Sequence, residues 1–265
     1  MVSALRPVLV LFAMLLALAP ALALEDSTEP PKPRAAPRGI VSEEILPRAG
    51  GVLVFGGTRG AGLEAVKELV KRGEKVTVMA RASSDTAALK TLGVNLVTGD
   101  AMMTDDMVKA FSAAPYRVVV SALGGPEDNL TVDVEGNRHV VDAAKSAKIP
   151  RVIMMSAIGA GDSALARPWY LRPFDANFIA AKSKAEDYLR KSGVTYTIVR
   201  AGRLVDKPPG EKPAALNEDH KIFSALTRAD AGRLLADCVK DEAGTSNKVL
   251  TAFDPARASF MGIFF

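Results

Sequence analysis

The chain contains few residues of several chemically important kinds. Its 265 residues include one cysteine, two histidines, one tryptophan and four tyrosines. A single cysteine, Cys238, excludes an internal disulfide and a cysteine-based metal cluster. The His, Asp and Glu residues form no cluster with the spacing of metal ligands, so no metal is expected. Cys238 follows Leu234 and Leu235 at helical spacing, which predicts a small core residue rather than a reactive thiol.

A strong excess of one charge is also missing. The net charge is +4, and the basic residues are spread along the chain without a basic block interleaved with aromatics. Nucleic acid is therefore not expected as a partner. With 48% hydrophobic residues the chain can bury one sizeable core. A small-molecule substrate, or none, and a monomer or homodimer are expected.

The first 24 residues differ from the rest. An apolar run from Val8 to Ala19 is followed by Pro20 and by Ala21-Leu22-Ala23, a pattern typical of a secretory signal peptide cleaved near Ala23. An uncleaved N-terminal anchor is the alternative, although the run is shorter than the ~20 residues of a full span. The pattern predicts export or membrane association, or organellar import through a secretory first step, with membrane contact only if the segment is retained.

The remaining chain divides by composition. Residues 25–49 contain five prolines and mixed charges, and we interpret them as a linker. Residues 50–254 are the expected folded domain, and residues 255–265 the expected C-terminal tail. The stretch 207–222 has weak periodicity and three prolines, which indicates a small loop-rich insertion beside the substrate.

Within the folded domain, short β-branched runs alternate with helical patterns. We predict strands at 52–55, 75–79, 95–98, 117–121, 151–156, 196–200 and 248–252. We predict helices at 63–71, 104–113, 134–147, 175–191 and 228–241. This alternation favours an α/β fold with a doubly wound (Rossmann) parallel sheet covered on both faces. A ligand would then lie at the carboxyl ends of the strands, where the strand order reverses.

A glycine-rich turn, "VLVFGGTRGAGLEAV", joins the first predicted strand to the first predicted helix. Its spacing is G-x-x-x-G-x-G, not the G-x-G-x-x-G usually cited for dinucleotide sites. A helix that begins directly after such a turn offers free N–H groups and the positive end of its dipole to an anion. The turn therefore predicts a dinucleotide pyrophosphate site formed by Gly56, Gly57, Thr58, Arg59, Gly60, Ala61 and Gly62.

The end of the second strand bears on the cofactor. NAD-binding domains place an acidic residue there for the ribose 2′-hydroxyl, whereas this chain has Arg81, with Arg59 in the glycine-rich turn. Two guanidinium groups can bind a 2′-phosphate through charge-assisted bonds. NADP(H) is therefore predicted in preference to NAD(H). The alternative is that both are ordinary surface arginines.

The stretch "VLVFGGTRGAGLEAVKELVKRGEKVTVMAR" resembles the opening of the short-chain dehydrogenase/reductase superfamily. Two later stretches, "DVEGNRHVVDAAKSAKIPRVIMMSAIGAGDS" and "AAKSKAEDYLRKSGVTYTIVRAG", are similar to its atypical, NmrA-like branch, often labelled NAD-dependent epimerase/dehydratase. The resemblance covers about residues 50–254.

The resemblance implies roles for residues at the ends of three strands. Asp100 would bond the adenine amino group, with Ala101 beside it. The residues expected to line the two riboses are Ser121, Ala122 and Leu123, and those expected to flank the nicotinamide are Ser156, Ala157 and Ile158. From the residues alone, Asp100 could instead cap the next helix, although Thr104 or Asp105 could begin that helix equally well.

Reductases of this superfamily usually pair a tyrosine with a lysine four residues later on one helical face. Lys182 is present here, but the tyrosine position holds Phe178, which cannot transfer a proton. Lys182 is expected to bond the nicotinamide ribose, or else to be a solvated residue like Lys184. Tyr170, Ser156 and Lys182 itself are the candidate proton donors.

The other aromatic and imidazole side chains are weaker candidates. Tyr188 and Tyr196 sit within apolar patterns and are expected in the core. His139 lies on a predicted helix and has no expected role, while His220 in the insertion could reach a substrate but is more typical of a surface residue.

Three functions fit these observations. The first is an NADP(H)-dependent oxidoreductase that acts on a small carbonyl, quinone or flavin-like acceptor. The second is a non-catalytic NADP(H)-binding protein that senses redox state or assists assembly, as several NmrA-like proteins do. The third is an enzyme like a sugar-nucleotide epimerase, which the missing tyrosine disfavours.

Overall fold

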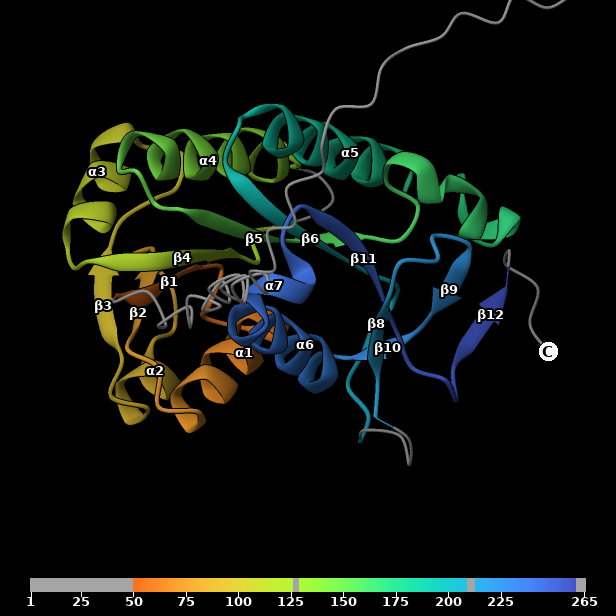
Figure 1. Cartoon of the computed structure of the whole chain (residues 1–265), viewed down its shortest axis with the longest axis horizontal. Coiled ribbons are helices and arrows are strands. Elements are labelled where there is room, and N and C mark those ends of the chain that lie inside the picture. Colours follow the sequence, from red (N-terminus) through yellow and green to blue (C-terminus); the bar gives the residue numbers. More distant parts are fainter. Residues whose placement is uncertain (1–49, 126–128, 209–212, 261–265) are drawn as a thin grey trace, which may run out of the picture. The chain divides into compact units, whose positions relative to one another are not determined.

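A computed structural model describes residues 50–125, 129–208 and 213–260 of the chain (Figure 1). The expected signal segment and linker, and the last five residues of the expected tail, lie outside these ranges. No helix in the described ranges is long and apolar enough to cross a membrane.

An eight-stranded sheet forms the centre of the domain, in the order β3-β2-β1-β4-β5-β6-β11-β8. Neighbouring strands pair in parallel except at β8, which runs antiparallel to β11. The strands are β1 (Gly51–Phe55), β2 (Val76–Ala80), β3 (Asn95–Thr98), β4 (Tyr116–Ser121), β5 (Arg151–Ala157), β6 (Thr195–Ala201), β8 (Ala215–Asn217) and β11 (Lys248–Phe253). The order reverses between β1 and β4, so the doubly wound α/β prediction is confirmed.

Helices cover both faces of the sheet. In Figure 1, α3, α4 and α5 lie on one face, and α1, α2 and α6 lie on the other. The α-helices are α1 (Gly60–Lys71), α2 (Ala87–Thr91), α3 (Thr104–Ser112), α4 (Asn137–Ser146), α5 (Ala176–Lys191), α6 (Arg228–Lys240) and α7 (Glu242–Thr245). A π-helical turn, η1 (Val132–Gly136), runs directly into α4, and two 3₁₀ turns, η2 (Gly161–Ala166) and η3 (Trp169–Leu171), precede α5. All five predicted helices are confirmed.

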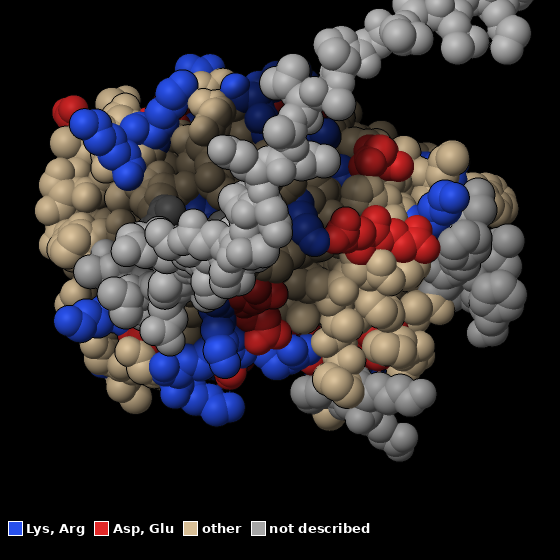
Figure 2. Space-filling model, in the orientation of Figure 1, with Lys and Arg blue, Asp and Glu red and all other residues tan. Residues whose placement is uncertain are grey.

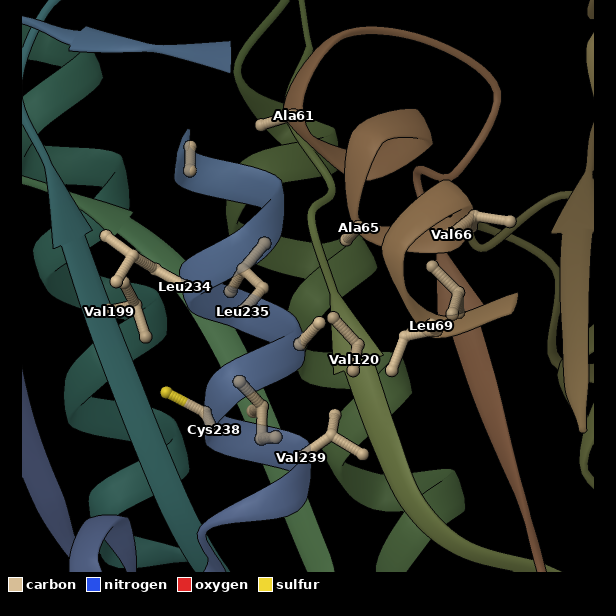
Figure 3. Close-up of a cluster of buried hydrophobic side chains, with 14 of the residues drawn as sticks. Ala61, Ala65, Val66, Leu69, Val120, Val199, Leu234, Leu235, Cys238 and Val239 are labelled. Carbon is tan, nitrogen blue, oxygen red and sulfur yellow. The ribbon is translucent and has the colours of Figure 1, made fainter. Parts of the chain in front are cut away.

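Helices α1 and α6 pack directly on one another over the sheet (Figure 3). Gly232 of α6 permits this approach, because a Cβ atom there would lie 2.5 Å from the Ala65 amide nitrogen of α1. Cys238 is fully buried in the same layer, and Figure 3 shows its sulfur pointing from α6 toward the strand that carries Val199. The prediction that Cys238 is a core residue is confirmed.

Two small ladders lie beyond the main sheet. Strand β7 (Leu204–Val205) pairs in parallel with β10 (Leu226–Thr227), and β9 (Ile222–Ser224) pairs antiparallel with β12 (Ala258–Phe260). Strand β12 therefore lies in the region expected as a tail. Residues 209–212 of the expected insertion are outside the described ranges, while β8 from the same insertion adds an edge strand to the main sheet.

Candidate functional site

The glycine-rich turn connects β1 to α1 at the point where the strand order reverses. Gly56 has a φ of +75°, and a Cβ atom there would lie 2.5 Å from the Ala122 carbonyl oxygen at the end of β4. A Cβ at Gly62 would lie 2.0 Å from the Gly56 carbonyl oxygen. Both positions therefore exclude a side chain, because the turn packs against β4 and folds back on itself. This close approach is what a pyrophosphate cradle requires.

Among the described residues, no side chain caps the first turn of α1. Its N-cap residue, Arg59, has an extended backbone and makes no side-chain cap, and no acidic residue lies in the first turn. The leading N–H groups of a helix have no intrahelical acceptor. In α1 they keep their hydrogen-bonding capacity and the positive end of the dipole for an external anion. Of the remaining turn residues, Gly57 and Ala61 are buried in the core layer, and Thr58 is half-buried.

Two arginines border this cradle. Arg59 is in the turn, and Arg81 directly follows β2, which pairs with β1. Both are exposed, and neither side chain has a hydrogen-bonding or ionic partner among the described residues. Arg81 therefore lies on the side of β1 opposite to β4.

The segment after β3 is held by its own hydrogen bonds. Asp100 Oδ1 accepts a bond from the Met102 N–H at 3.0 Å, and the Asp100 N–H donates to Asp106 Oδ2 at 2.8 Å. The N-cap of α3 is Met103, so the alternative role of Asp100 as a helix cap is wrong. Ala101 is buried, and its carbonyl oxygen lies 2.8 Å from His139 Nδ1. His139 therefore anchors this segment to α4.

The end of β4 is tied to α4 by buried polar groups. The Ser121 hydroxyl, fully buried, donates to Asn137 Oδ1 at 2.6 Å, and Asn137 Nδ2 donates to the Asp133 carbonyl oxygen at 2.8 Å. Ser121 is thus a structural anchor for the loop that follows it. Ala122 and Leu123, which are half-buried, continue from it and lie over the glycine-rich turn.

Lys182 of α5 lies in the same network. Its ammonium group pairs with Asp133 Oδ1 at 2.8 Å and donates to the Leu123 carbonyl oxygen at 2.9 Å, while Asp133 Oδ2 accepts from the Gly125 N–H at 2.7 Å. Both Lys182 and Asp133 are buried, so the alternative of a solvated lysine is wrong. The Phe178 ring lies 5.6 Å from the Lys182 nitrogen, where the superfamily's tyrosine would stand. Lys182 is thus held beside the loop that follows β4, with a phenyl ring rather than a phenol next to it.

A second buried network begins at the end of β5. The Ser156 hydroxyl donates to Glu186 Oε1 at 2.5 Å, and Arg200 Nε and Nη2 donate to the same carboxylate at 3.0 and 2.7 Å. Arg200 Nη1 continues to Asp162, whose other oxygen lies 2.9 Å from His220 Nδ1. The Ser156 hydroxyl is therefore engaged with a carboxylate and does not point freely at the nicotinamide position.

The charged groups of this second network shift one another's pKa values. Burial raises the pKa of Asp162, but hydrogen bonds from Arg200 and His220 outweigh it and lower that pKa to about 2. Burial lowers the pKa of Arg200, and its bonds to Glu186 overcome this and raise the pKa above its usual value. The network holds the ends of β5 and β6 together through charged pairs between Arg200 and the carboxylates of Glu186 and Asp162. His220, which also contacts the Val249 carbonyl oxygen, is one of its structural members.

The third proton-donor candidate, Tyr170, lies in η3 and is exposed. Its ring meets Trp169 edge-to-face, with centroids 5.9 Å apart. The two tyrosines expected in the core differ. Tyr196 is half-buried against the core as expected. The expectation for Tyr188 is wrong, because its exposed phenol donates to Asp142 at the surface.

The structure thus brings together Lys182, Leu123, Ala122 and the glycine-rich turn, and separates Ser156 from them as part of another network. Sequence reasoning missed four buried polar residues: Asp133, Asn137, Glu186 and Arg200. The signal that could have indicated them is a single charged or amide residue within an otherwise apolar helical or strand pattern. No group of three His, Cys, Asp or Glu side chains among the described residues could hold a metal ion. On the face seen in Figure 2, the basic residues drawn lie in separate groups with acidic residues between them.

Comparison with known proteins extends these observations. A family model described as NAD(P)H-binding matches residues 56–242. The chain is 25% identical to the chloroplastic divinyl chlorophyllide a 8-vinyl-reductase of Oryza sativa subsp. indica, over 89% of this chain and 61% of that protein. It is 31% identical to the photosystem II assembly factor Ycf39 of Cyanidium caldarium, over 56% of this chain and 45% of that protein. The chain therefore spans less than two thirds of either relative.

Solved structures support the same fold. ChuY, an anaerobillin reductase from Escherichia coli O157:H7, superposes with a TM-score of 0.69 at 25% identity, covering 77% of this chain and 97% of that one.

Proposed function

Because the chain belongs to the NAD(P)H-binding family, within the atypical, NmrA-like branch of the short-chain dehydrogenase/reductase superfamily, we propose that it is an NADP(H)-dependent oxidoreductase. The observation that carries the proposal is the glycine cradle at the uncapped start of α1. Gly56 and Gly62 leave room that a side chain would fill, and no acidic residue competes with an anion there.

Arg59 and Arg81 support NADP(H) over NAD(H). Both are exposed without described partners, and an acidic residue for the ribose 2′-hydroxyl is absent from the end of β2. A planar guanidinium can bind a phosphate through two parallel hydrogen bonds, which a ribose hydroxyl does not offer. The preference follows from a charge that only NADP(H) carries.

The site offers few side chains that could donate or accept a proton. When bound, the nicotinamide supplies or accepts a hydride. Lys182 is held by Asp133 and Leu123 and would orient the ribose, while Phe178 offers no proton. Ser156 is bonded to Glu186, which leaves Tyr170 and Lys182 as donors within the protein. An acceptor that takes its proton from water, such as a quinone or a flavin-like compound, suits this site better than an aldehyde.

The surface beside β5 favours an apolar, conjugated acceptor among these. Leu165, Trp169, Tyr170 and Phe174 are exposed, with Trp169 at 77% and Phe174 at 84%. The segment that carries them is anchored to the domain, because Ala166 and Leu171 pack on Ile158 at the end of β5. Two of the similar proteins are also reductases by name, one of a divinyl chlorophyllide and one of an anaerobillin.

Turnover tests the proposal. The full-length chain is mixed with NADPH and a panel of quinones, flavins and aldehydes, and absorbance of NADPH is followed. Steady consumption with a quinone or flavin, lost in Gly62→Val, supports the oxidoreductase. Gly193→Val, which strains the backbone at a φ of +81° outside the cradle, is the control that shows whether a strained glycine replacement alone abolishes turnover. Absence of consumption with every acceptor, despite NADPH binding, contradicts the oxidoreductase.

A non-catalytic NADP(H)-binding role in sensing or assembly is the second candidate. Phe178 in place of the tyrosine favours it, and the similarity to the assembly factor Ycf39 over 149 residues adds support. NADPH binding without turnover would select this function. The third function, like a sugar-nucleotide epimerase, loses support because epimerases rely on the same missing acid–base group.

We also propose that the domain works in an organelle or an exported compartment that it reaches through its N-terminal segment. The chloroplastic relatives and the signal-like residues 1–24 support this location. Mass spectrometry of the mature N-terminus from fractionated cells tests it. An intact N-terminus in a cytosolic fraction contradicts it.

A further inference from the structure

Two charged residues meet at the end of the small β7–β10 ladder. The strands are parallel, with Leu204 opposite Leu226 and Val205 opposite Thr227. The next residue on each strand is therefore brought to the same end: Asp206 after β7 and Arg228 after β10. Their side chains form an ion pair, with Arg228 Nη1 2.6 Å from Asp206 Oδ1.

Helix packing carries Arg228 to the glycine-rich turn. Arg228 is the first residue of α6, whose N-cap Thr227 accepts a hydrogen bond from the Asp230 N–H. The close contact at Gly232 fixes α6 against α1, so the two helices begin near one another. As a result, Arg228 Cδ and Nε lie 3.8 Å from where a Cβ atom on Gly60 would be, directly beside the start of α1.

The guanidinium is available to a ligand. The Arg228 side chain is 35% exposed, and its partner Asp206 is 81% exposed. An exposed ion pair of this kind is weak, and an anion with several oxygens can compete for the arginine. Arg228 lies 166 positions after Gly62 in the chain, so the glycine motif alone does not indicate it.

Resting on the proposed NADP(H) function, we propose that Arg228 is a third arginine of the cofactor site, one that binds the pyrophosphate rather than the 2′-phosphate. In the cofactor-free protein Asp206 holds Arg228, and the pyrophosphate displaces Asp206 on binding.

Affinity measurements with two nucleotides test this inference. NADPH and NADH are titrated by fluorescence into the full-length wild type and into Arg228→Ala, Arg228→Gln and Asp206→Asn. Both Arg228 variants should lose about tenfold in affinity, by the same factor for NADPH and NADH because both carry the pyrophosphate. Asp206→Asn should bind both nucleotides about twofold to fivefold more tightly, because the competing carboxylate charge is gone.

Arg190→Ala, which removes an exposed arginine near the C-terminal end of α5, is the matched control and should change neither affinity. Wild-type affinity in both Arg228 variants overturns the inference while the proposed function stands. A loss confined to NADPH also overturns it, because Arg228 would then read the 2′-phosphate. A wild type that binds neither nucleotide rejects the proposed function and this inference together.

Discussion

Glu186 should be the side chain on which the stability of the carboxyl edge depends most strongly. It is 1% exposed and accepts three side-chain hydrogen bonds, one from Ser156 and two from the fully buried Arg200. Replacing Glu186 with Ala leaves the Arg200 charge buried with Asp162 as its remaining carboxylate. Removing one partner of a buried ion pair typically costs about 3–5 kcal/mol of unfolding free energy.

We expect the lower end of that range, because Asp162 still neutralises part of the charge. For a domain of this size, a loss of about 3 kcal/mol lowers the melting temperature by roughly 6–12 °C. Urea denaturation and a thermal scan measure both quantities. Glu186→Gln keeps the shape and removes the charge, so it separates the ionic effect from the cavity.

The double variant Glu186→Leu/Arg200→Met supplies the control. Replacing both partners with apolar residues removes the stranded charge, so it should be less destabilised than Glu186→Ala alone. A loss below about 1 kcal/mol in Glu186→Ala, within the range of ordinary surface substitutions, would refute this account of the network.

Other predictions concern groups at a distance from Glu186. The pKa of Asp162 is about 2 in the folded protein and 3.8 ordinarily, so the unfolded state binds the proton more readily; unfolding free energy should fall as pH drops from about 4 toward 2, and Asp162→Asn should flatten that dependence in acid denaturation. Burial raises the pKa of the Cys238 thiol to about 12, so a thiol reagent at pH 8 should label it only upon unfolding, and rapid labelling of the native protein would contradict its burial. Gly232→Ala inserts a Cβ 2.5 Å from the α1 backbone and should cost about 1–3 kcal/mol in urea denaturation. Gly193→Ala is the contrasting case, because its φ of +81° strains the backbone while the space around it is open.

The sheet and its helices could be predicted because their patterns are long. Continuous apolar runs such as 52–55 are buried on both faces, and α1 places Ala65, Val66 and Leu69 at helical spacing toward the core. Two-residue strands such as β7 and β10 carry no such period. Strand β8 was hidden because its segment contains prolines nearby and its pairing depends on β11, more than 30 residues later.

The candidate site was predictable only where its chemistry is local. The glycine-rich turn could be predicted because close backbone approach requires glycine at both Gly56 and Gly62, and these two residues lie within one stretch of seven. Lys182 could be placed by resemblance, but its environment could not, since Asp133 comes from a π-helical turn 49 positions earlier. The role of Ser156 depends on Glu186 and Arg200, whose pairing is set by tertiary packing.

The most direct test of the central claim is the affinity of the full-length chain for NADPH and NADH, measured by fluorescence in the wild type and in Arg81→Asp. The account predicts tighter binding of NADPH by the wild type. It also predicts that Arg81→Asp weakens NADPH far more than NADH, because only NADPH brings the 2′-phosphate to this arginine. Equal affinities for the two nucleotides in the wild type would contradict the assignment of NADP(H).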